Sequence, residues 1–179
     1  MRIERIENSD EIREAFVRRF VTPWEDFRIK HKDWISETAQ NGNPIDINWY
    51  KNSYMWDKID SNYSEVSMNE ALEFLRTKGG RILFMSEKQA PFFYDSLVFD
   101  YVAETDAHAL AAQIERDWYE SYRFAERGMV DENAILPEDL YVFDSSMSWC
   151  AVFTHETSDW ESDDMMKEAE SRICIICKA

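Results

Sequence analysis

The residues best suited to chemistry lie in the C-terminal third of the chain. Thr154, His155 and Glu156 follow the apolar run 149–153, and an imidazole beside a carboxylate can act as a general base near neutral pH. No motif ties a serine or cysteine nucleophile to this histidine, and Asp159 stands where the H-E-x-x-H zinc spacing requires a second histidine. His155 and Glu156 are therefore candidate catalytic residues, although the same pattern is typical of a strand leaving the core.

A second candidate is a metal site built from the three cysteines and His155. Cys174 and Cys177 form a C-x-x-C pair, and Cys150 with His155 would complete a tetrahedral zinc site. The pair lies within "RICIIC", where the alternation of an extended strand sends the two sulfurs to opposite faces. Buried cysteines packing as small hydrophobic side chains explain the pattern without a metal. We therefore expect no metal and no other cofactor, and keep these four residues as the alternative.

The glycines exclude the common nucleotide-binding motifs. A P-loop or a dinucleotide fingerprint needs several glycines at close, set spacing so that the backbone can approach phosphate. The four glycines of this chain, at positions 42, 79, 80 and 128, form no such set. The nucleophile elbow G-x-S-x-G is missing for the same reason.

The charge of the chain is strongly negative and unevenly distributed. The formal net charge is −16, yet residues 1–30 hold seven acidic and seven basic side chains. Residues 131–170 hold twelve acidic side chains and one basic side chain, Lys167, a local charge of −11. Such a field repels nucleic acid and anionic membranes. It favours a basic protein as the partner, with a merely solubilising surface as the alternative.

Trp160 lies in this acidic region and has charged neighbours. Asp159 and Glu161 flank it, and Asp163 and Asp164 follow. An aromatic side chain within a charged rim is typical of an interface hot spot. These five residues are therefore the candidate partner-binding residues, unless Trp160 folds back onto the domain. The sequence leaves open whether a second group of aromatic side chains lies in the core or on the surface: Trp49, Tyr50, Tyr54 and Trp56.

The hydrophobic pattern predicts an α+β fold in a single domain, 1–179. Ser67 and Glu70 form a capping box before an apolar helix that a glycine pair at 79–80 ends. We expect a mostly antiparallel sheet of about five strands, packed against N-terminal and central helices that cover one face. The expected strands are 81–86, 96–104, 140–144, 148–155 and 172–177; the expected helices start near residues 9, 24, 68 and 106.

The predicted compartment is the cytoplasm. The N-terminal residues carry charges every two or three positions and have no apolar core of signal-peptide length. The longest apolar runs are too short to span a bilayer, and three cysteines do not suggest a disulfide framework.

Three segments carry a resemblance to known proteins: "YMWD" (54–57), "EALEFLRTKGGRILFMSE" (70–87) and "LPEDLYVFDSSMSWCAVFTHE" (136–156). They resemble a group of small bacterial proteins of unknown function with a C-terminal Y-V-F-D…W…T-H-E motif. They also look like the immunity proteins of polymorphic toxin systems, which are small, acidic, cytoplasmic α+β domains. The resemblance spans residues 50–156 and carries no catalytic residue.

Together, these observations predict a non-enzymatic acidic binding protein, an immunity-like or antitoxin-like inhibitor of a basic protein. The alternative is a small hydrolase or metal-dependent enzyme that uses His155, Glu156 and nearby acids. A third hypothesis is a homo-oligomer whose aromatic side chains are buried against a second copy.

Overall fold

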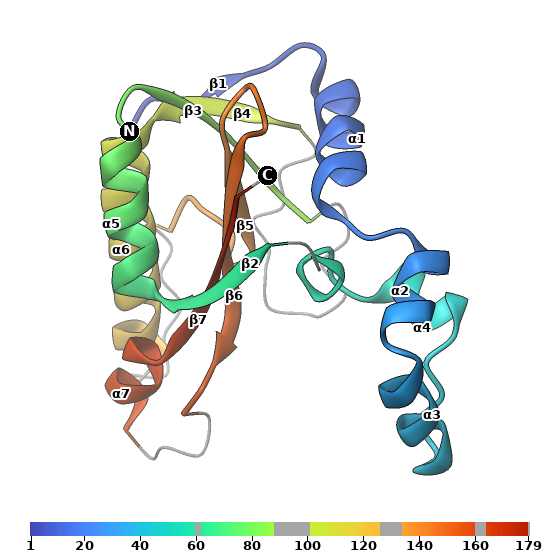
Figure 1. The fold of residues 1–179 in the computed structure, drawn as a ribbon. Coiled ribbons are helices and arrows are strands. Elements are labelled where there is room, and N and C mark those ends of the chain that lie inside the picture. The colour runs from blue at the N-terminus through green and yellow to red at the C-terminus, as the bar shows by residue number, and fades with distance from the viewer. Residues whose placement is uncertain (60–61, 88–100, 126–133, 160–163, 179) are drawn as a thin grey trace.

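The computed structural model describes residues 1–59, 62–87, 101–125, 134–159 and 164–178 (Figure 1). Within them, seven strands form one antiparallel sheet in the order β1-β4-β3-β5-β6-β7-β2. The strands are β1 (Glu4–Arg5), β2 (Tyr63–Ser67), β3 (Arg81–Ser86), β4 (Ala103–Asp106), β5 (Leu140–Phe143), β6 (Trp149–Thr157) and β7 (Arg172–Lys178). The helices are α1 (Ser9–Phe20), α2 (Trp24–Lys30), α3 (Lys32–Gln40), α4 (Ile47–Asn52), the 3-10 turn η1 (Trp56–Lys58), α5 (Met68–Lys78), α6 (Ala107–Ala125) and α7 (Met165–Glu170).

The fold is α+β, as the sequence predicts, and the sheet has more strands than the five expected. The two unexpected strands, β1 and β2, are short strands at the two edges of the sheet. The predicted strand 96–104 falls mostly outside the described residues, and only its last two residues belong to β4. The predicted strands 81–86, 140–144, 148–155 and 172–177 correspond to β3, β5, β6 and β7.

Helices α5 and α6 cover one face of the sheet, the α5–α6 face (Figure 1). The capping box that starts α5 is formed: Glu70 N–H donates to the Ser67 hydroxyl, and Ser67 N–H donates to the Glu70 carboxylate at 2.9 Å. Gly79 follows the helix with φ +57°, a left-handed conformation that glycine adopts without strain. Leu72 and Leu75 are fully buried in this core.

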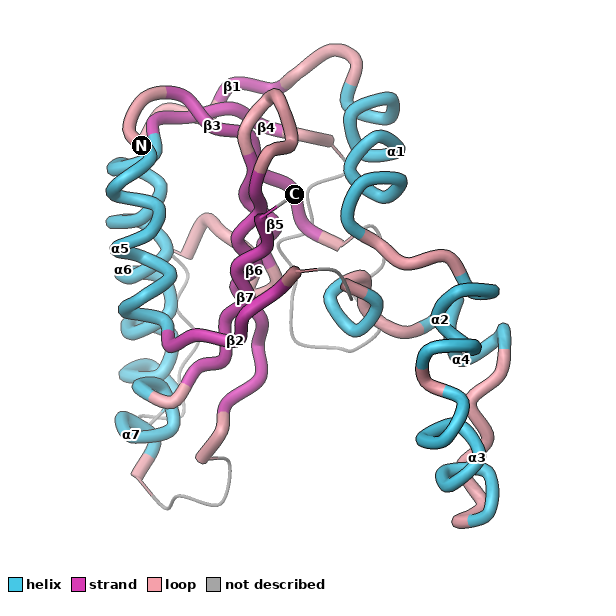
Figure 2. Tube along the Cα trace, viewed as in Figure 1, coloured by secondary structure: helices cyan, strands magenta, loops and turns pink. Residues whose placement is uncertain are grey.

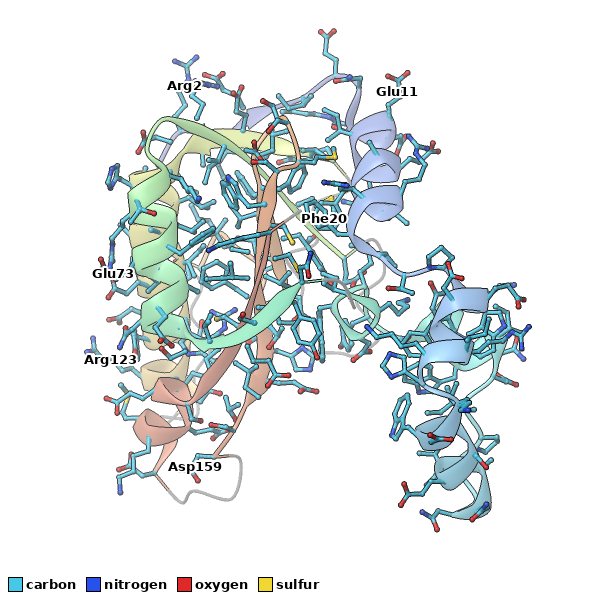
Figure 3. The ribbon with its side chains drawn as sticks, viewed as in Figure 1. Arg2, Glu11, Phe20, Glu73, Arg123 and Asp159 are labelled. Atoms are coloured by element: carbon cyan, nitrogen blue, oxygen red, sulfur yellow. The ribbon has the colours of Figure 1, made fainter. Side chains whose placement is uncertain are left out.

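The opposite face, the α1 face, is covered by α1 and η1, so the expectation that helices cover only one face is wrong. Phe16 and Phe20 of α1 are buried there, and Figure 3 shows Phe20 on the side of α1 that faces the sheet. The physical reason is that the central strands carry runs of consecutive buried residues, which point alternately to the two faces. In β5, for example, all four residues are buried, so both faces need a cover.

Helices α2, α3 and α4 form a helical arm (residues 24–52) that extends from the body beyond the end of α1 (Figures 1 and 2). Phe27 is buried at its centre, and its ring contacts those of Trp24, His31, Trp34, Trp49 and Tyr50. Trp49 and Tyr50 are half-buried in this cluster. In the described part of the chain, no helix combines the length and apolar character needed to cross a membrane.

The buried hydroxyl group of Tyr141 holds residues 54–59 against the α1 face through hydrogen bonds. The Tyr141 hydroxyl donates to the Glu87 carboxylate at 2.6 Å and accepts the Trp56 backbone N–H at 3.1 Å. The same carboxylate accepts the backbone N–H of Met55. Burial raises the pKa of Tyr141 well above its usual value, so the phenol keeps its proton and remains a donor.

We expect Tyr141→Phe to lower the free energy of unfolding by about 2 kcal/mol, because it leaves a buried N–H and a buried carboxylate without their shared partner. Urea denaturation measures the change. The control is Tyr63→Phe, whose phenol is on an exposed side chain and which should change stability by less than about 0.5 kcal/mol. Equal losses in the two variants would contradict this role for Tyr141.

Candidate functional site

A pocket of about 220 Å³ opens on the α1 face, beside the residues that Tyr141 fastens. Its walls come from three places: His31 on the helical arm, the η1 segment, and the ends of β2, β6 and β7. The described residues that line it are His31, Trp56, Asp57, Ile59, Tyr63, Glu65, Thr154, Glu156, Ile173 and Ile175.

The lining combines negative charge with aromatic rings. Asp57, Glu65 and Glu156 supply three carboxylates, and Trp56 and Tyr63 supply two aromatic faces. Among the described residues of the lining there is no lysine or arginine. Carboxylates and aromatic rings both attract cations, the rings through their negative faces. The pocket is therefore suited to a lysine or arginine side chain.

The environment of the Asp57 carboxyl group disfavours its charged form. Burial above all, and to a lesser extent the nearby charges of Glu156 and Glu87, raise its pKa from 3.8 to about 6. The backbone N–H of Tyr54, 3.0 Å from the carboxylate, and the charge of Lys58 act in the opposite direction. A carboxyl group in a pocket with a pKa raised in this way is typical of a binding or catalytic residue.

Lys58 is a cation whose charge acts on Asp57, and its ammonium group is hydrogen-bonded elsewhere. Its ammonium donates to the carbonyls of Tyr50 and Ser53 at 2.8 and 2.9 Å and lies over the Tyr50 ring. It ties the helical arm to the body, and burial lowers its pKa. Lys58 is not part of the described pocket lining, so the pocket acids keep room for an external cation.

His155 pairs with a carboxylate other than the one that adjoins it in sequence. Its Nδ1 lies 2.9 and 3.0 Å from the two carboxylate oxygens of Asp139, which also accepts the His155 backbone N–H at 2.9 Å. Hydrogen bonding to Asp139 raises the His155 pKa, against an opposing effect of burial. The rings of Tyr54 and Trp56 lie 5.0 and 6.1 Å from the imidazole. Glu156 instead lines the pocket.

Sequence reasoning missed the Asp139 partner because sixteen residues separate it from His155. The β5–β6 hairpin brings the two together: because Leu140 pairs with Phe153, Asp139 comes opposite Thr154 and therefore next to His155. An aspartate immediately before a predicted strand was the available signal. The contact between Asp139 and His155 depends on the register of the hairpin, which the sequence pattern does not give.

The structure separates the four residues of the metal alternative. Cys174 is buried on the α5–α6 face, whereas Cys177 and Cys150 are buried opposite each other on the α1 face. The period-two argument about the C-x-x-C pair is thereby confirmed. Burial raises the pKa of Cys174 to about 11, which disfavours the thiolate that zinc requires. No cluster of three or more metal-binding side chains occurs in the described residues.

The predicted partner-binding residues are only partly described. Trp160, Glu161 and Asp163 lie outside the described residues. Asp159 is exposed at the end of the molecule that carries α7 (Figure 3). Asp164 is exposed and caps α7, accepting the backbone N–H groups of residues 166 and 167. The role predicted for this segment stays a prediction.

Comparison with models of known families, with curated proteins and with solved structures finds no match for this chain. The resemblance to immunity proteins therefore stays a prediction, and function has to be inferred from the site itself.

We expect the His155 imidazole to titrate above its usual pKa of 6.5 in an NMR titration, because the Asp139 carboxylate stabilises the imidazolium ion. Asp139→Asn removes that charge and should bring the pKa back toward or below 6.5. The stability that the pair contributes is complete below pH 6.5 and is lost as the pH rises through the raised pKa. An unchanged His155 pKa in Asp139→Asn would contradict the assignment.

We expect Asp57→Asn to stabilise the protein above pH 6 by roughly 1 kcal/mol, after allowance for solvent screening. The folded protein resists ionising Asp57, so stability falls as the pH rises from about 4 to about 6 and stays low above that. Asparagine avoids this cost and can still accept the Tyr54 N–H. Thermal melts at pH 8 and pH 4 test this, and a gain of equal size at both values would refute it.

Proposed function

We propose that this chain is a non-enzymatic acidic binding protein whose partner is a basic protein, and that it inhibits that partner by occlusion, as an immunity protein does. The observation that supports this is the pocket lined by Asp57, Glu65 and Glu156 and by the rings of Trp56 and Tyr63. The net charge of −16 favours the same class of partner.

The binding event that we propose is the insertion of a lysine or arginine side chain into this pocket. The carboxylates neutralise the cation, and the rings cover its apolar stem and attract its charge. A cation over an aromatic face contributes about 0.5–2 kcal/mol, depending on how far it is desolvated. The wider negative field speeds the encounter and makes it sensitive to salt.

An enzymatic role is the second candidate, and one observation favours it. The Asp139–His155 pair is the arrangement that orients an imidazole as a general base. However, within the described residues no hydrogen bond joins His155 to a serine, threonine or cysteine side chain. The three cysteines are buried. No side-chain nucleophile is therefore hydrogen-bonded to the pair in that part of the chain, and we place the binding role first.

The test is the affinity for a nine-residue polyarginine peptide, measured by calorimetry in low salt and again near physiological salt. We expect a variant with Asp57→Asn, Glu65→Gln and Glu156→Gln to bind about tenfold more weakly than the parent protein. Because the three acids line one pocket, removing them should weaken binding far more than removing three acids elsewhere on the surface.

The matched control removes three exposed acids at the other end of the molecule: Glu7→Gln, Glu11→Gln and Glu14→Gln (Figure 3 labels Glu11). Its net charge changes by the same amount, so it should lose less than about threefold in affinity. Equal losses in the two variants would mean that only the general field binds the peptide. Affinity that does not depend on salt would contradict the proposal altogether.

A further inference from the structure

β2 is an edge strand, and its outer side is open in the described part of the chain. β2 pairs with β7 alone, and it lies in front of β7 in Figure 1. Lys178 N–H donates to the Asn62 carbonyl at 3.4 Å. In an antiparallel ladder, alternate residues bond to the same neighbour. Ser64 therefore bonds to β7, and the backbone N–H and C=O groups of Tyr63 and Glu65 point away from it.

The two residues whose backbone groups face outward also line the pocket. The Tyr63 and Glu65 side chains lie on the α1 face, and Tyr63 is 43% exposed. A strand added to β2 would place every second side chain on that same face. Those side chains would lie beside the pocket acids, so the backbone pairing and the pocket can be used at the same time.

The negative charge of Glu65, at the centre of β2, decides which kind of strand can pair with this edge. If two copies of this chain paired symmetrically through β2, Glu65 of one would lie opposite or next to Glu65 of the other, which is unfavourable. The net charge of −16 adds to the repulsion. A segment with lysine or arginine at alternate positions meets Glu65, Asp57 and Glu156 with the opposite sign.

We propose that β2 is the docking edge for an extended basic segment of the partner, which joins the sheet as an additional strand and places its cationic side chains over the pocket. This rests on the proposed function, because it assumes that the partner is basic. Backbone hydrogen bonds supply affinity in such an arrangement, and the pocket selects the side chains.

The first probe is a seven-residue peptide that alternates arginine with valine. The second is the same peptide with its central amides N-methylated, which keeps every charge and removes the backbone donors. We expect the methylated peptide to bind at least about tenfold more weakly. We also expect amide exchange at Tyr63 and Glu65, fast in the free protein, to slow on binding the first peptide, while Ser64 and Val66 are already protected.

The possible outcomes separate the two proposals. If both peptides bind equally and exchange at Tyr63 and Glu65 is unchanged, the strand addition is overturned while the cation pocket stands. If neither peptide binds, the proposed function fails together with the strand addition. If only the unmethylated peptide binds and protects both amides, the edge is the docking site.

Two substitutions of Glu65 test the same proposal by changing the protein instead of the peptide. Glu65→Gln removes the charge and keeps the outward N–H, whereas Glu65→Pro removes both. Proline is tolerated on an edge strand where its nitrogen faces outward, so the ladder to β7 and the melting temperature should persist. We expect Glu65→Pro to bind the first peptide about tenfold more weakly than Glu65→Gln. Equal affinities would overturn the proposal.

Discussion

The candidate site depends on one buried hydroxyl group. Tyr141 sits at the centre of the α1 face and holds the segment 54–59 through Glu87 and the backbone of Trp56. That segment carries Trp56 and Asp57 into the pocket wall. Because an unpaired polar group in this core is costly, the three partners have to stay together, and this holds the η1 wall of the pocket in place against the sheet.

The same site lowers the stability of the folded chain. Burial, and to a smaller extent the neighbouring acids Glu156 and Glu87, raise the pKa of Asp57, so the folded chain bears a cost when this carboxylate is charged. The indole N–H of Trp56 is buried without an acceptor in the described residues, a further cost. A basic ligand would relieve the repulsion between the acids. Residues selected for stability alone would not be arranged in this way.

The sequence predicted the central strands and the capped helix α5 because their signals are local. Continuous apolar runs such as residues 82–85 need burial on two faces, and the Ser67–Glu70 box uses contacts three residues apart. The strand β2 was missed because four of its five residues are exposed, so they carry no alternation to read. Its strand character comes from pairing with β7, more than 100 residues away.

The sequence by itself determined the class of fold, the excess of negative charge and the absence of nucleotide-binding motifs. It also determined that the sulfurs of Cys174 and Cys177 point apart, since strand alternation is a local property. Only the tertiary structure decided that Asp139, rather than Glu156, pairs with His155, and that Asp57, Glu65 and Glu156 share one pocket. Asp57 and Glu65 lie on the neighbouring elements η1 and β2, whereas Glu156 comes from the distant strand β6. Their proximity follows from strand register and from the packing of η1, which no local pattern encodes.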